Sequence, residues 1–131
     1  MESILTSIKK LLGIEESCEH FDVDLIMHIN SVISILSQLG VCPSKSLRIE
    51  DKSTTWNELI SDNTDLEYVK TYVYLKVRLL FDPPLSSSVM NSINQIISEL
   101  EWRITSSAED KQSNWKEEYS KWIIMNFIIS E

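Results

Sequence analysis

The sequence predicts an all-α fold, a small helical bundle of about five helices with a long loop and a C-terminal arm or extra helix. Only two glycines and three prolines occur among 131 residues, although 43% of the residues are hydrophobic. This composition leaves few turn residues for a β-sandwich or barrel. Apolar residues instead recur at steps of three and four, the spacing of one helix face. A chain of this length is expected to form one modest core.

The N-terminal third contains two predicted helices, each followed by a glycine. The first is short, with apolar residues at helical spacing from Ile4 to Leu12 and with Gly13 at the position of a left-handed C-cap. The second is predicted to have Asp22 as its N-cap and to end before Gly40. Its apolar stripe is wide and consists of Leu25, Ile29, Val32, Ile33, Leu36 and Leu39.

A connecting loop and a short helix are predicted next. Residues Val41 to Ser53 contain a proline, three serines and mixed charges without periodicity, which is typical of a loop. Thr55 and Glu58 have capping-box spacing, so a third helix of about two turns is expected to begin there. Trp56 is expected to hold this helix against the core.

Residues Glu67 to Pro84 fit either a helix or a strand. The alternation of apolar and polar residues after Tyr72 has the period of a strand. A helix is favoured because the pattern continues for about fifteen residues, longer than a usual strand, and follows the capping pair Thr64 and Glu67. Asp82 and the two prolines after it must end the element. The predicted core face of this helix is Leu66, Val69, Tyr72, Val73, Leu75, Leu79 and Leu80.

The fifth predicted helix begins in the serine run 86–88 and is amphipathic. Trp102 is predicted to lie about 200 degrees around it from Leu100, facing away from the core. An exposed ring of this size indicates an interface anchor, an isolated surface aromatic, or a ring covered by the C-terminal segment. Arg103 is expected to form a surface ion pair with Glu99. The predicted apolar stripe is Val89, Ile93, Ile96, Ile97, Leu100 and Ile104.

The C-terminal segment is predicted to be an extension with its own role. Polarity rises from Ala108 to Lys121, and the run from Trp122 to Ile129 is almost continuously apolar. This run is far below the roughly 20 residues needed to span a bilayer. It either closes the core of its own chain or docks into a neighbouring chain. We therefore expect a helical domain over 1–108 and a C-terminal extension or docking arm over 109–131. The spacing of Trp115, Tyr119, Trp122 and Ile123 indicates that the approach to the apolar run is helical.

The composition argues against enzymatic chemistry and against nucleic-acid binding. A net charge of −8 opposes binding to a phosphate backbone. No nucleotide-binding, nucleophile-elbow or zinc-protease motif occurs, so the sequence predicts no catalytic residue, cofactor or metal. Cys18 and Cys42 are expected to be free thiols. The acidic group between Glu15 and Asp24 lacks the spacing of a calcium loop and is interpreted as a solvated surface.

Two segments carry a resemblance to a known family. The stretch from Glu67 to Pro84, EYVKTYVYLKVRLLFDPP, precedes a helix that reaches ELEWR at residues 99–103. This arrangement resembles the small head-tail connector proteins of tailed bacteriophages and prophages, also called head-completion or adaptor proteins. The similarity extends upstream through the two N-terminal helices and covers residues 1–105.

The resemblance implies a non-enzymatic virion protein of the neck region, made in the host cytoplasm. Such a subunit forms a ring below the portal, follows the portal's twelvefold symmetry, extends the DNA channel and provides the tail attachment surface. The implied partners are other copies of the chain, the portal protein and a tail-completion or stopper protein. Packaged DNA would pass through without sequence-specific binding, and no membrane is involved.

The expected contacts between subunits are basic and aromatic. Six basic residues are expected either to pair with acidic faces of neighbouring protomers or to serve ordinary surface solubility, namely Lys9, Lys10, Lys70, Lys76, Arg78 and Arg103. The loop from Val41 to Ser53 is a further candidate for contacts. An alternative function is an acidic helical decoy that binds a host DNA-processing protein, whose mark would be a continuous acidic stripe. The candidate interface residues are Lys70, Tyr74, Lys76, Arg78, Trp102, Arg103, Trp122, Ile123 and Phe127.

Overall fold

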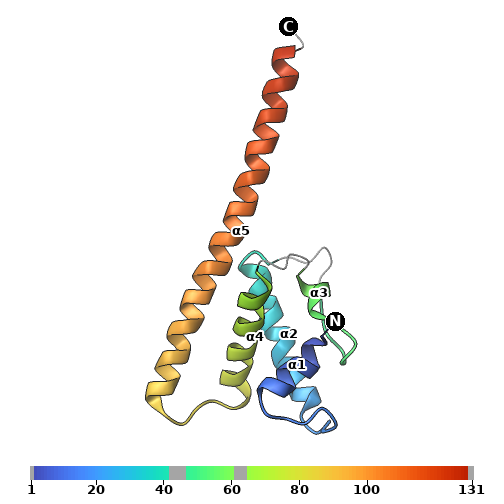
Figure 1. Cartoon of the computed structure of the whole chain (residues 1–131), viewed down its shortest axis with the longest axis vertical. Coiled ribbons are helices and arrows are strands. Elements are labelled where there is room, and N and C mark those ends of the chain that lie inside the picture. Colours follow the sequence, from blue (N-terminus) through green and yellow to red (C-terminus); the bar gives the residue numbers. More distant parts are fainter. Residues whose placement is uncertain (1, 42–46, 61–64, 130–131) are drawn as a thin grey trace.

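In the computed structural model, the second half of the last helix projects from a body formed by the other helices and its own first half (Figure 1). The structure describes residues 2–41, 47–60 and 65–129, except for the side chains of 110–120, 122–123 and 126–129. Within these ranges the β-structure is one isolated antiparallel bridge, between Ser3 and Thr55. The prediction of an all-α fold is confirmed. The helices are α1 (Ile4–Leu11), α2 (Asp22–Gln38), α3 (Trp56–Leu59), α4 (Leu66–Phe81) and α5 (Ser87–Ile129).

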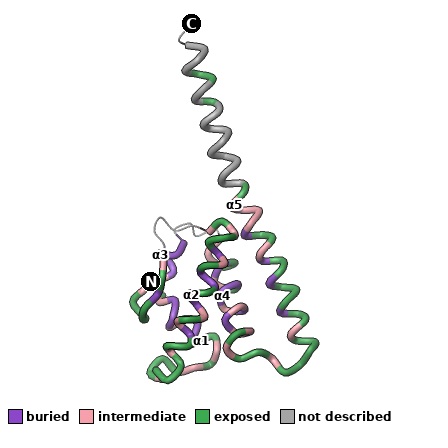
Figure 2. The backbone as a smooth tube through the Cα atoms, turned by 180° about the vertical axis from the view of Figure 1, so that it is seen from behind, coloured by how far each residue is buried: buried purple, intermediate pink, exposed green. Residues whose placement is uncertain are grey.

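The helix α4 lies at the centre of the body. It packs against α2 and against α5, and α1 packs on α2. Buried residues concentrate in α1 to α4 and recur at intervals along the first half of α5 (Figure 2). One continuous hydrophobic core therefore joins all five helices. Its largest fully buried side chains include Trp56, Tyr72, Ile4, Ile8, Leu25, Ile29 and Leu36.

The first helix, α1, is capped at its N-terminus by Ser3 and is followed by the predicted left-handed Gly13. The Ser3 side chain accepts a hydrogen bond from the Thr6 N–H, which caps the N-terminus. Gly13 follows the helix with a φ of 80°, the left-handed conformation that glycine adopts without strain.

Lys9 is buried, with 3% of its surface exposed, so the prediction that it contacts a neighbouring protomer is wrong. Its ammonium donates to the carbonyl oxygens of Glu16 at 3.0 Å and Cys18 at 2.6 Å. It also lies 2.9 Å from Asp22 Oδ1, a buried oxygen for which this ion pair supplies the partner. A lysine ammonium has three donors, and each one has a partner here. Lys9 thus holds the turn between α1 and α2 in place.

The same contact explains the start of α2. Asp22 is the first helical residue, and the N-cap is Phe21, which makes no side-chain cap. The predicted N-cap at Asp22 is therefore wrong by one residue, because the Asp22 carboxylate faces Lys9 rather than the free N–H groups of the helix. The helix ends before Gly40, as predicted.

The part of the long loop that the structure describes is attached to α2. The Asn30 side chain donates to the Ile49 carbonyl at 3.0 Å and accepts from the Ile49 N–H at 2.8 Å. Ile49 itself is fully buried. The loop therefore contributes to the core between residues 47 and 53, and its residues 42–46, Cys42 among them, lie outside the described residues.

The capping box of α3 is confirmed, since Thr55 and Glu58 form both of its hydrogen bonds. Trp56 is 1% exposed and holds the helix to the core, as predicted. The helix has four residues rather than the two turns expected. It stops because Ile60 is extended, with a φ of −140°, and is itself buried.

The segment after Asp65 is a helix and not a strand, which confirms the preferred prediction. Asp65 is the N-cap residue, and Thr64, the predicted cap, lies outside the described residues. The predicted core face needs two corrections. Leu80 is 55% exposed, and Val77 is fully buried. Val77 continues the steps of four that bury Val69 and Val73, whereas Leu80 lies in the last turn, where the chain leaves the bundle.

The apolar stripe of α5 is narrower than predicted. Its buried members are Ile93, Ile97, Leu100 and Ile104, whereas Val89 is 42% exposed and Ile96 is 44% exposed. The helix packs chiefly on α4. A single partner helix covers only a narrow seam, so apolar residues at the edges of the stripe stay accessible.

The helix α5 continues without interruption through the expected boundary at residue 108. The predicted helical approach to the apolar run is therefore confirmed. Figure 1 shows the second half leading away from the body, and Ile124 and Met125 are 55% and 62% exposed. For these two residues, the interpretation that the run closes the core is wrong. Docking into another chain, and the division into 1–108 and 109–131, stay predictions.

Two contacts fix α5 where it leaves the body. The Ser107 hydroxyl donates to Asp65 Oδ2 at 2.8 Å, at the start of α4. Gly40, at the end of α2, has a φ of 105°, and a Cβ added to it would lie 2.6 Å from the Ala108 Cβ. Glycine is therefore needed at position 40 both for its backbone conformation and for the close approach of α5.

We predict that Gly40→Ala destabilises the protein more than Gly13→Ala. Both substitutions strain a left-handed backbone, at a cost of about 1–3 kcal/mol, but a Cβ at Gly13 meets nothing within 4 Å. Urea unfolding followed by circular dichroism measures both. Adding Ala108→Gly to Gly40→Ala should recover part of the lost stability, less the cost of about 1 kcal/mol for a helical glycine. Equal losses in the two single variants would contradict the proposed contact.

Candidate assembly interface

The surface of the described residues includes one shallow depression. This depression of about 280 Å³ beside α1 is open to solvent and is lined by Thr6, Lys10, Gly13, Ile14, Glu15 and Glu16. Within the described ranges no three His, Cys, Asp or Glu side chains gather closely enough to hold a metal ion. None of the helices, as far as their residues are described, has an apolar stretch long enough to cross a membrane. Cys18 is a free thiol, as predicted.

Three of the predicted interface cations have acidic partners in their own chain. Arg103 pairs with Glu99 at 2.8 Å, which confirms the ion pair expected from their spacing. This pairing, together with the nearby Tyr68, raises the pKa of Arg103. Lys70 lies 3.5 Å from Glu2. The third cation, Lys76, lies 3.8 Å from Glu101. The charges of all three cations are therefore partly neutralised within the chain.

Arg78 differs from these three cations. It is half-buried near the end of α4, and no described carboxylate forms an ion pair with it. Tyr74, one turn earlier, is also half-buried and packs against the core. Of the predicted basic contacts on α4, Arg78 is the one that forms no ion pair among the described residues.

A polar cluster fastens α5 to α4. Tyr72 is fully buried, and its hydroxyl donates to Glu101 Oε1 at 2.9 Å. The Lys76 ammonium lies 3.8 Å from the same oxygen and 5.9 Å from the centre of the Tyr72 ring. Burial, and then the hydrogen bond and charge of Glu101, raise the pKa of Tyr72. The sequence predicts the packing role of Tyr72 but carries no signal for its pairing with Glu101, 29 residues away.

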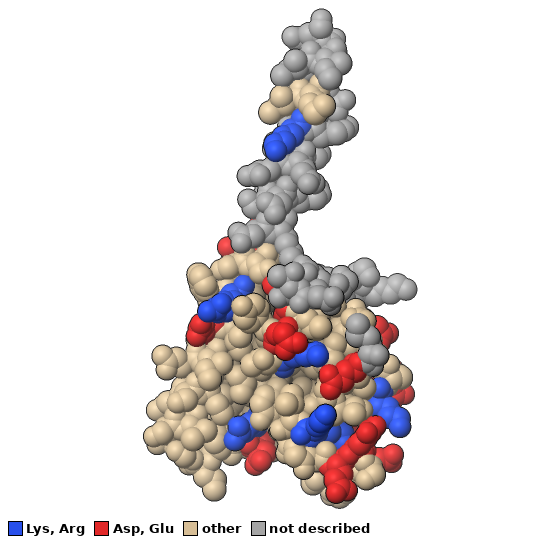
Figure 3. All heavy atoms as spheres, in the orientation of Figure 1, with Lys and Arg blue, Asp and Glu red and all other residues tan. Residues whose placement is uncertain are grey.

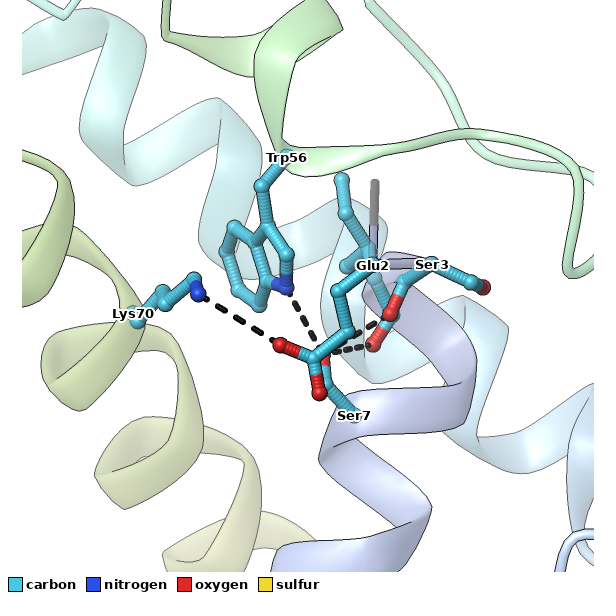
Figure 4. Close-up of polar contacts among 6 residues, drawn as sticks. Glu2, Ser3, Ser7, Trp56 and Lys70 are labelled. Atoms are coloured by element: carbon cyan, nitrogen blue, oxygen red, sulfur yellow. Dashed lines mark hydrogen bonds and ion pairs between the residues drawn. The ribbon is translucent and has the colours of Figure 1, made fainter. Parts of the chain in front are cut away.

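Lys70 is positioned by a second cluster, around Trp56 (Figure 4). The Trp56 indole N–H donates to Ser7 Oγ at 2.7 Å, and the Ser7 hydroxyl donates in turn to the Ser3 carbonyl at 2.8 Å. The Lys70 ammonium lies 5.8 Å from the centre of the Trp56 ring and pairs with Glu2. Backbone bonds from Ile4 to Thr54 and from Trp56 to Glu2 complete the connection. This network ties the N-terminus to α3 and α4.

Trp102 is 69% exposed, so the prediction that it faces away from the core is confirmed. Its neighbour Arg103 points back to the body, 5.5 Å from the centre of the Tyr68 ring. The other predicted aromatic and apolar contacts, Trp122, Ile123 and Phe127, lie in the projecting part of α5, and their side chains are outside the described set. Ile124 and Met125 are the described apolar side chains of that run, and both are exposed.

A small all-α body with a projecting helix and exposed apolar side chains is typical of a subunit that assembles with other chains. The family model described as phage connector protein matches residues 4–111, which are 108 of the 131 residues. The chain therefore belongs to the phage connector protein family. Comparisons with curated proteins and with solved structures gave no match. The match ends close to Ala108, where α5 leaves the body.

Family membership confirms the resemblance carried by the segments at 67–84 and 99–103. The protein is a structural connector of a bacteriophage, of a family that is generally non-enzymatic, and it assembles with other phage head or tail proteins. The matched region contains the first six predicted interface residues, from Lys70 to Arg103. The last three, from Trp122 onward, lie beyond it.

We predict that Ser7→Ala lowers the free energy of unfolding by about 1–3 kcal/mol, because it leaves the buried Trp56 N–H without an acceptor. Ser34→Ala is the matched control. The Ser34 hydroxyl is exposed and bonds only the Asn30 carbonyl of its own helix, so a change within about 0.5 kcal/mol is expected. Chemical denaturation measures both variants, and a loss in Ser7→Ala no larger than in the control would refute the role of this hydrogen bond.

We predict an alkaline loss of stability that depends on Tyr72. Because the folded state raises the pKa of this phenol above its usual value of about 10, the fold favours the neutral form. Its contribution is complete below about pH 10 and declines above it by about 1.4 kcal/mol per pH unit. The stability advantage of the wild type over Tyr72→Phe should therefore shrink between pH 10 and 11.5, as measured by urea unfolding. Tyr74→Phe controls for the loss of a phenol hydroxyl from the same helix. If the stability advantage of the wild type over Tyr72→Phe does not change with pH, the prediction is contradicted.

Proposed function

We propose that this protein is a head-tail connector, or adaptor, subunit that forms a ring below the portal. The ring would extend the DNA channel toward the tail and provide the tail attachment surface in the neck of the virion, after synthesis in the host cytoplasm. The observation that carries this proposal is the family match over residues 4–111, which includes every helix of the body.

The exposed apolar side chains and the net charge of the chain support assembly into a ring. Contacts that repeat around a ring are heterologous, so each subunit needs two different contact faces. Exposed apolar side chains occur on α2, at Val23 and Met27, and on α5, at Val89, Ile96 and Trp102. The net charge of −8 disfavours adhesion of DNA, which suits a channel through which DNA must move.

The projecting half of α5 is proposed as a docking arm for the portal or a neighbouring subunit. Its run from Trp122 to Ile129 is apolar in sequence, and the helix carries it away from the body (Figure 1). Trp102 is proposed as an anchor on the body, since large exposed aromatic side chains are enriched among residues that dominate binding. Lys70, Tyr74, Lys76, Arg78 and Arg103 would form the polar rim of these contacts.

The decoy function finds no support on the face seen in Figure 3. There, acidic and basic side chains are intermixed rather than arranged in one acidic stripe. Lys70, Lys76 and Arg103 also pair with carboxylates of the same chain, which further interrupts any acidic stripe.

The test is an affinity pull-down of tagged protein from cells that produce the parent phage, with native mass spectrometry of the eluate. Recovery of a portal oligomer that carries a ring of this chain is the expected result. Recovery of a host nuclease or repair protein without portal would overturn the connector assignment.

Two variants extend this assay. Deleting residues 122–131 is expected to abolish portal recovery while the body stays folded, because the projecting helix lies outside the core. Loss of cooperative unfolding in the deletion variant would instead indicate that the run belongs to the core. Trp102→Ser should weaken recovery, whereas Asn91→Ser, at an exposed polar position of the same helix, should not.

A further inference from the structure

An apolar strip lies open along α2. Val23 is 79% exposed, and Met27, one turn later, is 59% exposed. Ser31 and Ser34 follow at steps of four and three, which places all four residues on one side of the helix. These residues, here called the α2 strip, extend along about 17 Å of the helix.

The serines of the α2 strip can be covered by an apolar partner. The Ser31 hydroxyl donates to the Met27 carbonyl at 3.0 Å, and the Ser34 hydroxyl donates to the Asn30 carbonyl at 3.2 Å. Both hydroxyl hydrogens are therefore bonded within the helix already. Burial of the strip leaves neither donor unpaired, so a partner can follow it over three turns.

The fold itself does not explain the two large apolar side chains of the strip. Val23 and Met27 are neither among the buried core residues nor among the partly buried ones that pack against the core. They lie one turn apart and are both accessible. Exposed apolar side chains that lie next to one another are typical of a binding surface.

The charge around the strip is negative. Residues 11–44 contain none of the 12 lysines and arginines of the chain. Asp22 pairs with Lys9, but the other four acidic residues of the segment are exposed, and no described cation forms an ion pair with them. Figure 2 shows the turn between α1 and α2 as largely exposed. These four unpaired carboxylates are Glu15, Glu16 and Glu19 in the turn and Asp24 in α2.

This charge favours a cationic partner for the strip. Asp24 is three residues before Met27 and therefore borders the strip, and Glu19 lies in the turn just before α2. A partner with Lys or Arg beside apolar residues can pair with these carboxylates while it covers the apolar side chains. A second copy is disfavoured, because two chains of net charge −8 repel each other, and DNA is disfavoured for the same reason.

We propose that the α2 strip binds a cationic amphipathic helix of a different phage head or tail protein. Such a helix carries apolar residues on one side and can place Lys or Arg at the edges of that side. The proposal rests on the proposed connector function for the neighbouring protein, and it adds the surface of the contact and the chemistry of the partner.

A designed peptide tests this chemistry with the isolated full-length protein. The probe is an amphipathic helix of leucine and lysine, about 18 residues or five turns long, labelled with a fluorophore and followed by fluorescence anisotropy. Binding that weakens with added salt is the expected result. The same peptide with glutamate in place of every lysine should not bind. Absence of binding by the lysine peptide would overturn the inference.

Matched variants locate the bound peptide. Val23→Ser with Met27→Ser should weaken peptide binding about tenfold or more, because it removes the apolar surface of the strip. Val89→Ser with Ile96→Ser removes exposed apolar side chains from α5 instead and should leave the affinity unchanged. All four residues are exposed, so both variants should keep the circular dichroism of the wild type. Equal affinities of the two variants for the peptide would overturn the inference.

A second pair of variants measures the contribution of charge. Asp24→Asn should weaken peptide binding about threefold, and the difference from wild type should fall at high salt because the charges are screened. Glu67→Gln removes an exposed carboxylate of α4 that has no described ion pair, and it should have a smaller effect. Equal effects of the two substitutions would overturn the assignment of a cationic partner to the strip.

Cross-linking in phage-producing cells separates this inference from the proposed function. A photoreactive analogue of phenylalanine replaces Met27 in the tagged chain, and mass spectrometry identifies the cross-linked peptide. The expected peptide belongs to another phage protein and contains Lys or Arg beside apolar residues. The same analogue in place of Asn91, on α5, should not capture this peptide.

Each outcome of the cross-linking decides one of the two proposals. Portal recovered without a cross-link at position 27, or with a cross-link to another copy of this chain, overturns the inference and leaves the connector function standing. A cross-link to a cationic segment of another phage protein, without recovery of portal, overturns the connector function and leaves the contact standing.

Discussion

The structure depends on the burial of α4 on two sides. Val73 and Val77 are fully buried, as is Tyr72, and the helices that cover α4 are α2 and α5. A fully buried phenol needs a hydrogen-bond partner, and Glu101 of α5 supplies it. Lys76 then lies close enough to offset the carboxylate charge. The position of α5 on the body therefore follows from what α4 must bury and what its tyrosine must bond.

The narrow seam between α4 and α5 determines which residues remain available to other chains. Because one helix provides most of the cover for α5, Val89 and Ile96 stay accessible beside buried Ile93 and Ile97. The same helix continues past Ala108, which lies close to Gly40 of the body, and leads outward to a run that is apolar in sequence. Its two halves thus present different surfaces, one beside the body and one projecting from it, as expected of a subunit with more than one partner.

Four of the cations predicted to contact other subunits are paired within the chain's own structure. The Lys9 ammonium makes all of its contacts with the turn between α1 and α2. Lys70, Lys76 and Arg103 have carboxylate partners within the chain. Surface ion pairs of this kind contribute little to stability, but they reduce the number of cations available for complementary pairing between acidic subunits.

The sequence by itself determined several features that depend on residues within one or two helical turns, although it misplaced the N-cap of α2 by one residue and overestimated the length of α3. These include the helical periods, the capping box before Trp56, the left-handed Gly13 and the pairing of Glu99 with Arg103. The family match likewise follows local segments. Tertiary structure decided the burial of Lys9, the exposure of Leu80, and the hydrogen bonds of Trp56 with Ser7 and of Tyr72 with Glu101. Burial and distant polar contacts depend on which helices meet and at what angle, and periodicity within one helix carries no information about that choice.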